Sequence, residues 1–432
     1  MSTISNYPTS KLFVNRSCFF RFVVTNLEMA FDQSKYAQPR SQVLLEDVDV
    51  TAEMPACSPP RSDRAAHATL TRSVYCVLGL PIDAIDLTTV VQRIEAAAAN
   101  RATYLISTPN LNFLVNSLSD PEFRESLLDS DLCPPDGAPI VWIARLLGLP
   151  IKERVAGSDL LDQLRAGRAG ARRLALYLFG GAKGVAAAAA TKLNAEAGGL
   201  NCVGTMDPGF CEVSEMSQDH VMDTLNSSGA DFLVLSLGAK KGQLWLQRNH
   251  HRLTIPIRAH LGAAVNFQAG LIDRAPPVVR KWGFEWLWRI KEEHYLWKRY
   301  RDDGLVLLRL LLTRVLPLAI MTRWQQFSSK HHDLTVKNSH DGRSIVIGLS
   351  GAATKQHVAK ATSSFHEALA SGQDVVVDLT NAQVIDARFL GLLLMLRKEL
   401  RSRGAALIIS GASRSMVRMF QLHELGFLLQ PA

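Results

Sequence analysis

One acidic residue stands out for its neighbours. Asp136 lies in the stretch LCPPDGAPIVWIARLLG, residues 132–148, between two prolines and a glycine and just before an apolar run with helical spacing. Asp followed by Gly is common in tight turns, and Asp is a good helix N-cap, so a purely structural role is open. The alternative is that the rigid neighbours hold this carboxylate at the mouth of a cleft as a general base.

Small and polar residues follow several of the predicted strands. In an open parallel sheet, ligands bind at the carboxyl ends of the strands, so residues there are candidates for a site. The stretch LFGGAKG opens a helix with a glycine turn that lets backbone N–H groups meet a phosphate, although any tight strand-to-helix turn uses glycine. The residues at these strand ends are Ser107, Thr108, Asn110, Gly180, Gly181, Gly238, Gly262 and Asn266.

Strands and helices alternate along the part of the chain that carries these residues. From about Ser73, apolar runs such as ATYLISTPN, RLALYLFGG and ADFLVLSLG alternate with helical stretches such as TTVVQRIEAAAANR. Strands that are apolar along their whole length, with helices between them, predict a parallel sheet covered on both faces. The first run, SVYCVLGLPID, is predicted to belong to the same sheet. The fold class is therefore α/β.

Basic and aromatic residues are concentrated between Arg274 and Arg323. This pattern suits a phosphate-bearing ligand or an anionic membrane surface better than DNA, and no DNA-reading motif is present, so nucleic acid is not an expected partner. Within it, the apolar stretch GLVLLRLLLTRVLPLAIM contains Arg309, Arg314 and Pro317. We therefore expect an amphipathic helix in the membrane interface rather than a spanning helix. The alternative is a helix buried against the catalytic domain or a dimer partner.

Composition is that of a globular chain with room for two or three domains, at 432 residues, 47% hydrophobic, 20% charged and a net charge of +8. The six cysteines lack metal-site spacing and predict reduced, mostly buried thiols in a cytoplasmic protein. Residues 1–72 predict a disordered N-terminal extension. Residues 11–24 are apolar but too short and too charged for a membrane span or signal peptide, and Met29 is an alternative start.

Residues 73–301 resemble the WecG/TagA/CpsF glycosyltransferases (family 26). The matching stretches are STPNLNFL, PPDGAPIVWIARLLG, ERVAGSDLL, LYLFGGAKGVAAAAATKL, DFLVLSLG, QAGLIDRAP and EWLWRIKEE, in the family's order and spacing. The resemblance implies a Rossmann-like parallel-sheet domain and an inverting hexosyltransferase that needs no metal and no cofactor. Such an enzyme moves a sugar from a UDP-sugar donor to a polyprenyl-diphosphate-linked acceptor in exopolysaccharide or surface-glycan biosynthesis. It works as a peripheral protein at the inner, cytoplasmic face of the cell membrane.

The resemblance also implies roles for individual residues. Asp136 matches the Asp of the family's PDG motif, its proposed base, which takes the proton of the acceptor hydroxyl as that oxygen attacks. Thr108 and Asn110 would line the same cleft. Arg289 and Arg299 are the best matches to family arginines that reach the donor diphosphate. One carboxylate is enough, because UDP is already a stable leaving group.

Several positions depart from the family's pattern, and the Pro and Arg of its usual EPxR segment are missing around residues 294–296. Gly242 and Gln243, in GAKKGQLW, stand where the family has Gln and Glu, and Asn266 stands where it has Asp. An altered donor sugar explains these changes, because Asp136 and the arginines remain. The alternative is a catalytically inactive scaffold that recruits partners.

Residues 334–432 resemble a STAS domain through the stretch VVVDLTNAQVIDARFLGLLLML, and residues 302–333 are predicted to form the amphipathic helix and a polar linker. The domain is small, α/β and without a plausible catalytic cluster. Regulatory STAS domains carry a phosphorylated serine at the position of Ala387, which has no hydroxyl, so the resemblance implies a module that docks a protein partner or regulates without that switch. The neighbouring Arg388 predicts a permanent contact with an acidic partner surface or with the chain's own enzyme domain.

Overall fold

The computed structural model describes residues 68–168, 172–276, 279–280, 282–327, 333–342 and 344–430. Most of the predicted N-terminal extension, including the apolar stretch at residues 11–24, lies outside these residues. Its last part, residues 68–72, is described, and there Leu70 and Arg72 are buried.

A five-stranded parallel sheet forms the centre of the first domain. Its strands stand in the order β3-β7-β6-β4-β5, and every neighbouring pair is parallel. This confirms the predicted α/β class. The strands are β3 (Tyr104–Ser107), β4 (Leu174–Gly180), β5 (Leu200–Met206), β6 (Phe232–Ser236) and β7 (Ile257–His260).

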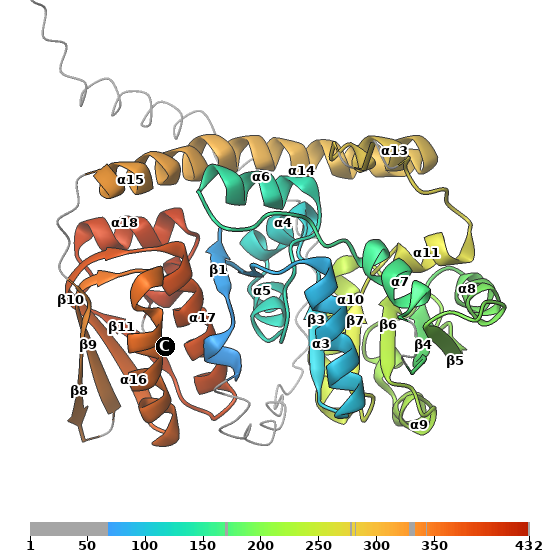
Figure 1. The fold of residues 1–432 in the computed structure, drawn as a ribbon, viewed down its shortest axis with the longest axis horizontal. Coiled ribbons are helices and arrows are strands. Elements are labelled where there is room, and N and C mark those ends of the chain that lie inside the picture. The colour runs from blue at the N-terminus through green and yellow to red at the C-terminus, as the bar shows by residue number, and fades with distance from the viewer. Residues whose placement is uncertain are drawn as a thin grey trace, which may run out of the picture. The chain divides into compact units, whose positions relative to one another are not determined.

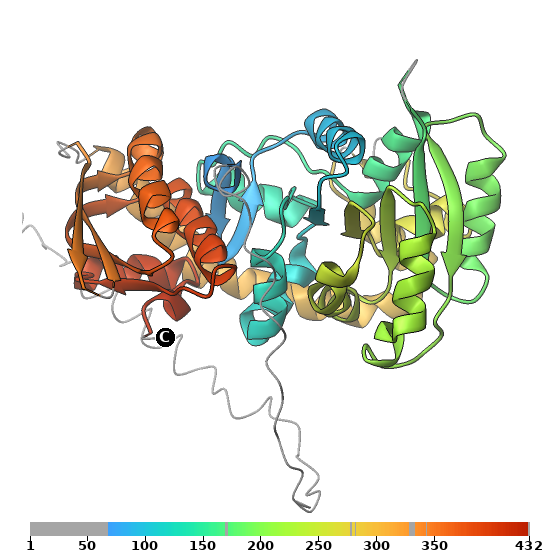
Figure 2. The same cartoon turned by 90° about the horizontal axis from the view of Figure 1, so that it is seen from below.

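Helices cover both faces of this sheet (Figure 2). Alternate residues of β4 divide between two apolar clusters, Leu176 and Leu178 on one face and Tyr177 and Phe179 on the other, as the two-residue period of a strand requires. The first face packs against α3 (Leu87–Ala99), α7 (Gly157–Ala166), α8 (Val185–Asn194) and α11 (Ala264–Ala269), and the second against α9 (Asp219–Ser227) and α10 (Ala239–Asn249).

The run SVYCVLGLPID forms an antiparallel hairpin outside the parallel sheet, which corrects the prediction for it. Strands β1 (Val74–Val77) and β2 (Leu80–Asp83) pair through a turn at Leu78 and Gly79. These two residues have φ of 49° and 84°, the backbone of a two-residue turn that matches the twist of paired antiparallel strands. Every residue of both strands is buried, so the run lacks the alternation that marks a hairpin.

Four helices lie between β3 and β4, three short ones followed by α7, and a long helical run follows the sheet (Figure 1). The long run comprises α13 (Glu285–Glu292), α14 (Trp297–Leu310), a π turn (Leu311–Val315) and α15 (Leu316–Phe327). Residues His294–Gln325 are long and apolar enough to cross a membrane by length and composition alone: an 18-residue window within them has a mean hydropathy of 2.0, and 22% of that window is buried. The short helices are α4 (Leu111–Ser119), α5 (Pro121–Leu128) and α6 (Ala138–Leu146).

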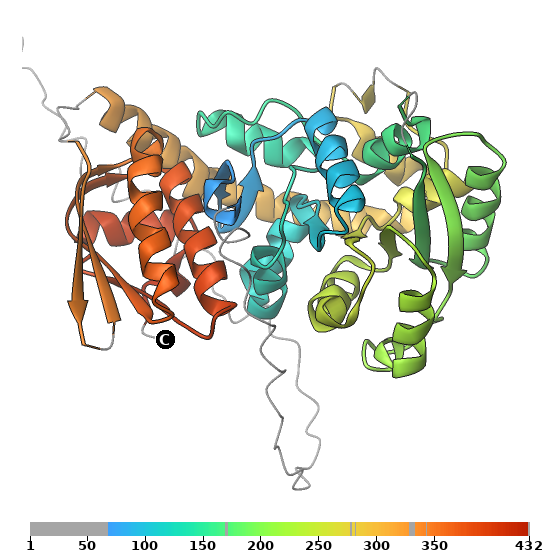
Figure 3. The same cartoon turned by 60° about the horizontal axis from the view of Figure 1, so that its bottom comes forward.

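The C-terminal domain has a four-stranded sheet in the order β11-β10-β9-β8, in which only β8 is antiparallel to its neighbour. Strand β8 (Thr335–Asp341) lies in the polar stretch SSKHHDLTVKNSHDGR, whose composition predicts a linker, and it is an edge strand whose residues are mostly exposed. Helices α16 (Val358–Ala370) and α17 (Ala387–Arg401) lie side by side next to this sheet (Figure 3). The remaining elements are β9 (Ser344–Ala353), β10 (Asp374–Ile385), β11 (Leu407–Ser410) and α18 (Arg414–Leu422).

Helix α17 is buried all round, because it packs on its own sheet and also on the hairpin of the first domain. A Cβ on Gly391 would lie 2.2 Å from the carbonyl oxygen of Val74, so the helix backbone approaches β1 directly. A single apolar core holds Leu80 of the hairpin, Leu318 of α15 and Phe389 of α17. The first domain and the C-terminal domain therefore share one core.

Candidate functional site

The turn that carries Asp136 is fixed on both sides by backbone hydrogen bonds. The amide of Asp136 donates to the carbonyl of Pro109 at 2.9 Å, and the amide of Val155 donates to the carbonyl of Pro135 at 2.7 Å. Gly137, with φ of 80°, holds the N-cap position of α6. The N-cap residue of α6 is therefore Gly137, and Asp136 does not have the N-cap role that the sequence leaves open for it.

Asn110 lies beside this turn. It caps α4 by accepting the amide of Phe113 at 3.1 Å, and its Cβ would be 3.8 Å from a Cβ on Gly137. Thr108, two residues earlier, is buried directly after β3. The structure therefore places Asn110 next to the Asp136 turn.

A cluster of charged side chains from three distant segments surrounds the half-buried Asp136. Arg154 forms an ion pair with Glu285 and lies 3.5 Å from Asp159. Asp159 also accepts from Arg274 at 2.7 Å and from Arg280 at 3.2 Å. Each of these arginines already has a carboxylate partner other than Asp136.

This surrounding changes the acidity of Asp136. The pKa of its carboxyl is raised to about 7, mainly by burial, with the negative charges of Glu285 and Asp159 adding to the rise and the positive charge of Arg154 and the Gly137 amide opposing it. A carboxylate with a pKa near neutrality is a stronger base than an ordinary Asp and is still ionised in a large fraction of molecules at pH 7.

The sequence predicts Asp136 but not its charged neighbours. Arg154, Asp159, Arg274 and Glu285 lie in the stretches ERVAGSDLL, QAGLIDRAP and EWLWRIKEE, which carry the resemblance described above. The sequence therefore shows these charged residues in three separate stretches, but a single sequence does not show that the three stretches come together in the fold.

The strand-end glycines lie where the sheet changes direction. From β4 the chain moves outward to β5, and from β6 it moves to β7 on the other side, so β4 and β6 flank the topological switch point. Gly180 and Gly181 end β4 with φ of 90° and 100°, and a Cβ on Gly180 would lie 2.6 Å from Leu237. Both positions need glycine, and the turn leaves backbone at the place where open α/β sheets bind ligands.

Gly242 is explained by a histidine. A Cβ on Gly242 would lie 2.1 Å from Cδ2 of His260, so this ring occupies the space beside α10 that a longer side chain would need. His260 donates from Nε2 to the carbonyl of Leu237 at 2.7 Å, and burial lowers the pKa of its ring. Gln243 is fully buried and accepts from the Ser107 hydroxyl at 3.1 Å.

The two predicted arginines lie on the helices after the sheet. Arg289, on α13, pairs with Glu293 and stacks 5.9 Å from the ring centre of Phe267, which follows the half-buried Asn266 on α11. Arg299, on α14, stacks 5.1 Å from the ring centre of Tyr300. The charges with the largest effect on Asp136 are other residues, so the structure does not give these arginines a direct contact with it.

Among the described residues, no group of three or more His, Cys, Asp or Glu side chains could hold a metal ion. In the same part of the chain, Cys76, Cys133 and Cys202 are buried free thiols, and Cys211 is a half-buried one.

Two stretches of the chain match known families. Residues 75–319 match the family described as "Glycosyl transferase WecG/TagA/CpsF family", and residues 336–430 match "Mlab, STAS domain". The first match covers the parallel sheet, the Asp136 turn and most of the long helical run.

Two relatives are named N-acetylglucosaminyldiphosphoundecaprenol N-acetyl-beta-D-mannosaminyltransferase. The protein from Bacillus spizizenii is 24% identical over 227 residues, which are 51% of this chain and 85% of the relative. The protein from Bacillus subtilis is 24% identical over 195 residues, 45% of this chain and 74% of the relative.

Two solved structures are similar to a short part of the chain. The phosphorylated form of the Bacillus cell fate determinant SpoIIAA is 20% identical with a TM-score of 0.20, covering 23% of this chain and 91% of that chain. An antisigma-factor antagonist STAS domain from Rhodobacter sphaeroides is 29% identical with a TM-score of 0.16, covering 21% of this chain and 100% of that chain.

Proposed function

The chain belongs to the glycosyl transferase WecG/TagA/CpsF family, and from this premise we propose that it moves a sugar from a UDP-sugar donor to a polyprenyl-diphosphate-linked acceptor sugar. The names of the two Bacillus relatives, which contain both a diphosphoundecaprenol acceptor and a transferred amino sugar, support this acceptor class. The product would enter exopolysaccharide or cell-surface glycan biosynthesis.

The observation that carries the proposal is the environment of Asp136. Its carboxyl has a pKa of about 7 and lies on a turn held by hydrogen bonds to both sides. In the proposed reaction this carboxylate accepts the proton of the acceptor hydroxyl, whose oxygen forms a bond to the anomeric carbon of the donor. The bond from that carbon to UDP breaks as the new one forms, so the configuration inverts.

The leaving diphosphate needs positive charge and backbone donors. Gly180 and Gly181 at the switch point support binding of the donor there, and Arg289 and Arg299 are our candidates for contacts with its phosphates. Thr108 and Asn110 would line the cleft beside Asp136, and Asn266 would face the donor sugar. No metal is required by this scheme, because arginines supply the charge.

The long helical run supports work at a membrane. Its solvent side shows an apolar stripe at three- and four-residue spacing, the spacing of one helix face. Exposed Arg301, Arg309 and Arg323 lie along the same run. Such a helix can lie in the interface of an anionic bilayer, with the arginines at the headgroups, which suits a peripheral enzyme whose acceptor is a lipid. The stripe is formed by Leu305, Leu308, Leu312, Leu316, Ile320 and Trp324.

A scaffold without activity is the second candidate, favoured by Gly242 and Asn266 at positions where the family has other side chains. The packing of His260 weakens this alternative. Its ring fills the space that a side chain at position 242 would occupy, so the loss of that side chain is compensated and its space beside α10 is not left empty.

The test is a transfer assay with a panel of UDP-sugars and a polyprenyl-diphosphate-linked N-acetylglucosamine acceptor, read by mass spectrometry. We expect transfer from at least one donor. We expect Asp136→Asn to lower kcat roughly 10²- to 10⁴-fold, the usual scale for removing a general base. Asp86→Asn is the matched control, because Asp86 caps α3 and Asn caps equally well. Absence of transfer from every donor would favour the scaffold.

A further inference from the structure

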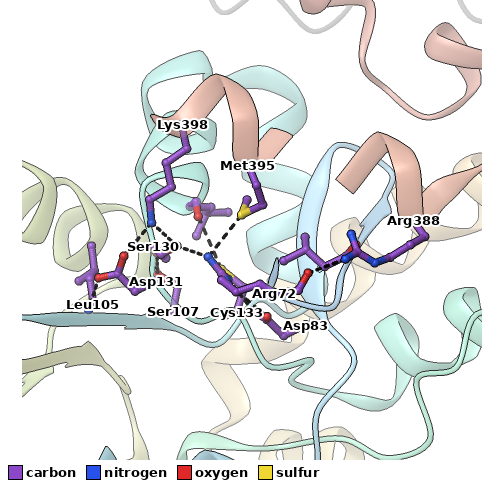
Figure 4. A network of polar contacts seen from close by, with 12 residues as sticks. Arg72, Asp83, Leu105, Ser107, Ser130, Asp131, Cys133, Arg388, Met395 and Lys398 are labelled. Atoms are coloured by element: carbon purple, nitrogen blue, oxygen red, sulfur yellow. Dashed lines mark hydrogen bonds and ion pairs between the residues drawn. The ribbon is translucent and has the colours of Figure 1, made fainter. Parts of the chain in front are cut away.

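A buried polar network joins the STAS domain to the transferase domain. Figure 4 shows three side chains of α17, Arg388, Met395 and Lys398, that reach across to the hairpin and to the segment after α5. Arg388 donates to the carbonyls of Arg72 at 2.8 Å and Val74 at 3.3 Å. Of the two contacts that the sequence suggests for Arg388, the structure shows the one with the chain's own enzyme domain.

The contacted segment, Ser130–Cys133, is an extra strand-like edge beside β3. The amide of Asp131 donates to the carbonyl of Leu105 at 2.7 Å, and the amide of Ser107 donates to the carbonyl of Leu132 at 3.0 Å. On its other side, the amide of Cys133 donates to the Asp83 carboxylate at 2.7 Å. The segment is therefore held from two directions before it enters the proline turn.

Lys398 makes the main contact of the STAS domain with this segment. Its Nζ donates to the carbonyl of Ser130 and to the Asp131 carboxylate, both at 2.8 Å, and only 3% of its side chain is exposed. Arg72 donates to the same Ser130 carbonyl at 3.0 Å and pairs with Asp83 at 2.6 Å. A buried cation in low dielectric strongly favours the arrangement that keeps its partners in place.

The segment leads directly to the proposed base. Pro134 and Pro135 follow Cys133, and their fixed φ angles leave little freedom between the held segment and Asp136. We propose that the STAS domain is a permanent part of the structure that builds the transferase site, and that Lys398 is a positioning residue for the Ser130–Cys133 segment and so for Asp136. This inference rests on the proposed function only in assigning a reaction to Asp136.

The rest of the same interface supplies a control. Arg401, one turn after Lys398 on α17, pairs with Glu125 and is 40% exposed on its side chain. It joins the same two domains and has the same sign of charge, but its carboxylate partners, Glu125 and, at 3.8 Å, Asp129, precede the Ser130–Cys133 segment. If the interface only held the two domains together, loss of Arg401 and loss of Lys398 should have similar effects on kcat.

The experiment compares Lys398→Met, Lys398→Arg and Arg401→Met in the full chain. Lys398→Met should lower kcat roughly 10- to 100-fold, because a small displacement of a reacting group is costly, while KM for the UDP-sugar changes little. Lys398→Arg should restore most of kcat, and Arg401→Met should keep it. Independently of activity, hydrogen–deuterium exchange of a peptide spanning residues 130–137 should become about tenfold faster in Lys398→Met alone.

Several results would overturn the inference. One is unchanged exchange and unchanged kcat in Lys398→Met, and another is an equal effect of Lys398→Met and Arg401→Met. If Lys398→Met does not fold, Asp131→Asn removes the other charge of the same pair and takes its place under the same criteria. If the wild-type chain transfers no sugar, the proposed function fails, but the exchange measurement still decides whether Lys398 holds the segment.

Discussion

At the scale of single residues, the site depends on a carboxyl group that is kept from its usual acidity. Arg154 acts on Asp136, but Arg154, Arg274 and Arg280 are each paired with Asp159, Asp162 or Glu285. Binding of a diphosphate near these arginines would compete for the same positive charge. Because these arginines are paired with other carboxylates, they do not lower the pKa of Asp136 to its usual range. They remain close enough to bind a phosphate group of a substrate.

This environment predicts a pH dependence. Because a base must be deprotonated, kcat/KM should rise with pH through about 7, the pKa of Asp136, rather than through the ordinary carboxyl range. A profile of kcat/KM measured with acceptor below its KM, between pH 5 and 9, checks this expectation at about half-unit steps. A flat profile across this range would show that Asp136 is not the titrating base.

The same pKa has a consequence of opposite sign for stability. The folded chain keeps a proton on Asp136 that the unfolded chain has lost above about pH 4, so the free energy of unfolding falls as pH rises from about 4 to 7. Asp136→Asn removes this term, and its Tm at pH 8 should be roughly 2–4 °C above that of the wild type. A variant that is both inactive and more stable would separate loss of the base from loss of the fold.

At the scale of elements, the sequence predicts the repeating parts well. Runs such as RLALYLFGG, apolar on both faces, predict the parallel sheet and its covering helices. The sequence does not predict the hairpin β1–β2. Both of its faces are buried, and one of them is covered by α17, which comes more than 300 residues later in the chain. The sequence does not predict strand β8 either, because β8 is a mostly exposed edge strand without an apolar face. Its register is set by pairing with β9. Asp136 is predicted by its neighbours in sequence, whereas its pKa depends on side chains that meet only in the fold.

The apolar stripe of the long helical run predicts membrane binding. Leu312→Glu should reduce flotation of the protein with anionic vesicles, because a charged side chain in the middle of the stripe opposes its insertion. Val203→Glu is the control, since Val203 is similarly exposed, at 41% against 51% for Leu312, but lies on β5. High salt should weaken binding as well, because charge attraction is screened over about 8–10 Å. Equal flotation of both variants would assign the helix a role in protein contacts instead.

At the scale of the whole molecule, the STAS domain contributes residues to the apolar core that contains the β1–β2 hairpin. Without α17, the part of the buried hairpin on which this helix packs would be exposed to water, because the α17 backbone approaches β1 directly. A chain that ends at Phe327 should therefore aggregate and bind a hydrophobic dye, and should lack transferase activity. Co-expression of residues 333–432 as a separate chain should restore solubility. A soluble, active truncated chain with an unchanged Tm would show that the two domains are independent.

The hydrogen bond from Arg388 to the Arg72 carbonyl joins residues 316 positions apart in the chain. At a synthesis rate of about 5–20 residues per second, the hairpin leaves the ribosome roughly 15–60 s before the helix that covers it has been made. During that interval its apolar faces must be kept from other nascent chains. The apolar core that the hairpin shares with the C-terminal domain is completed only after α17 has emerged, so the hairpin remains uncovered until that domain is present.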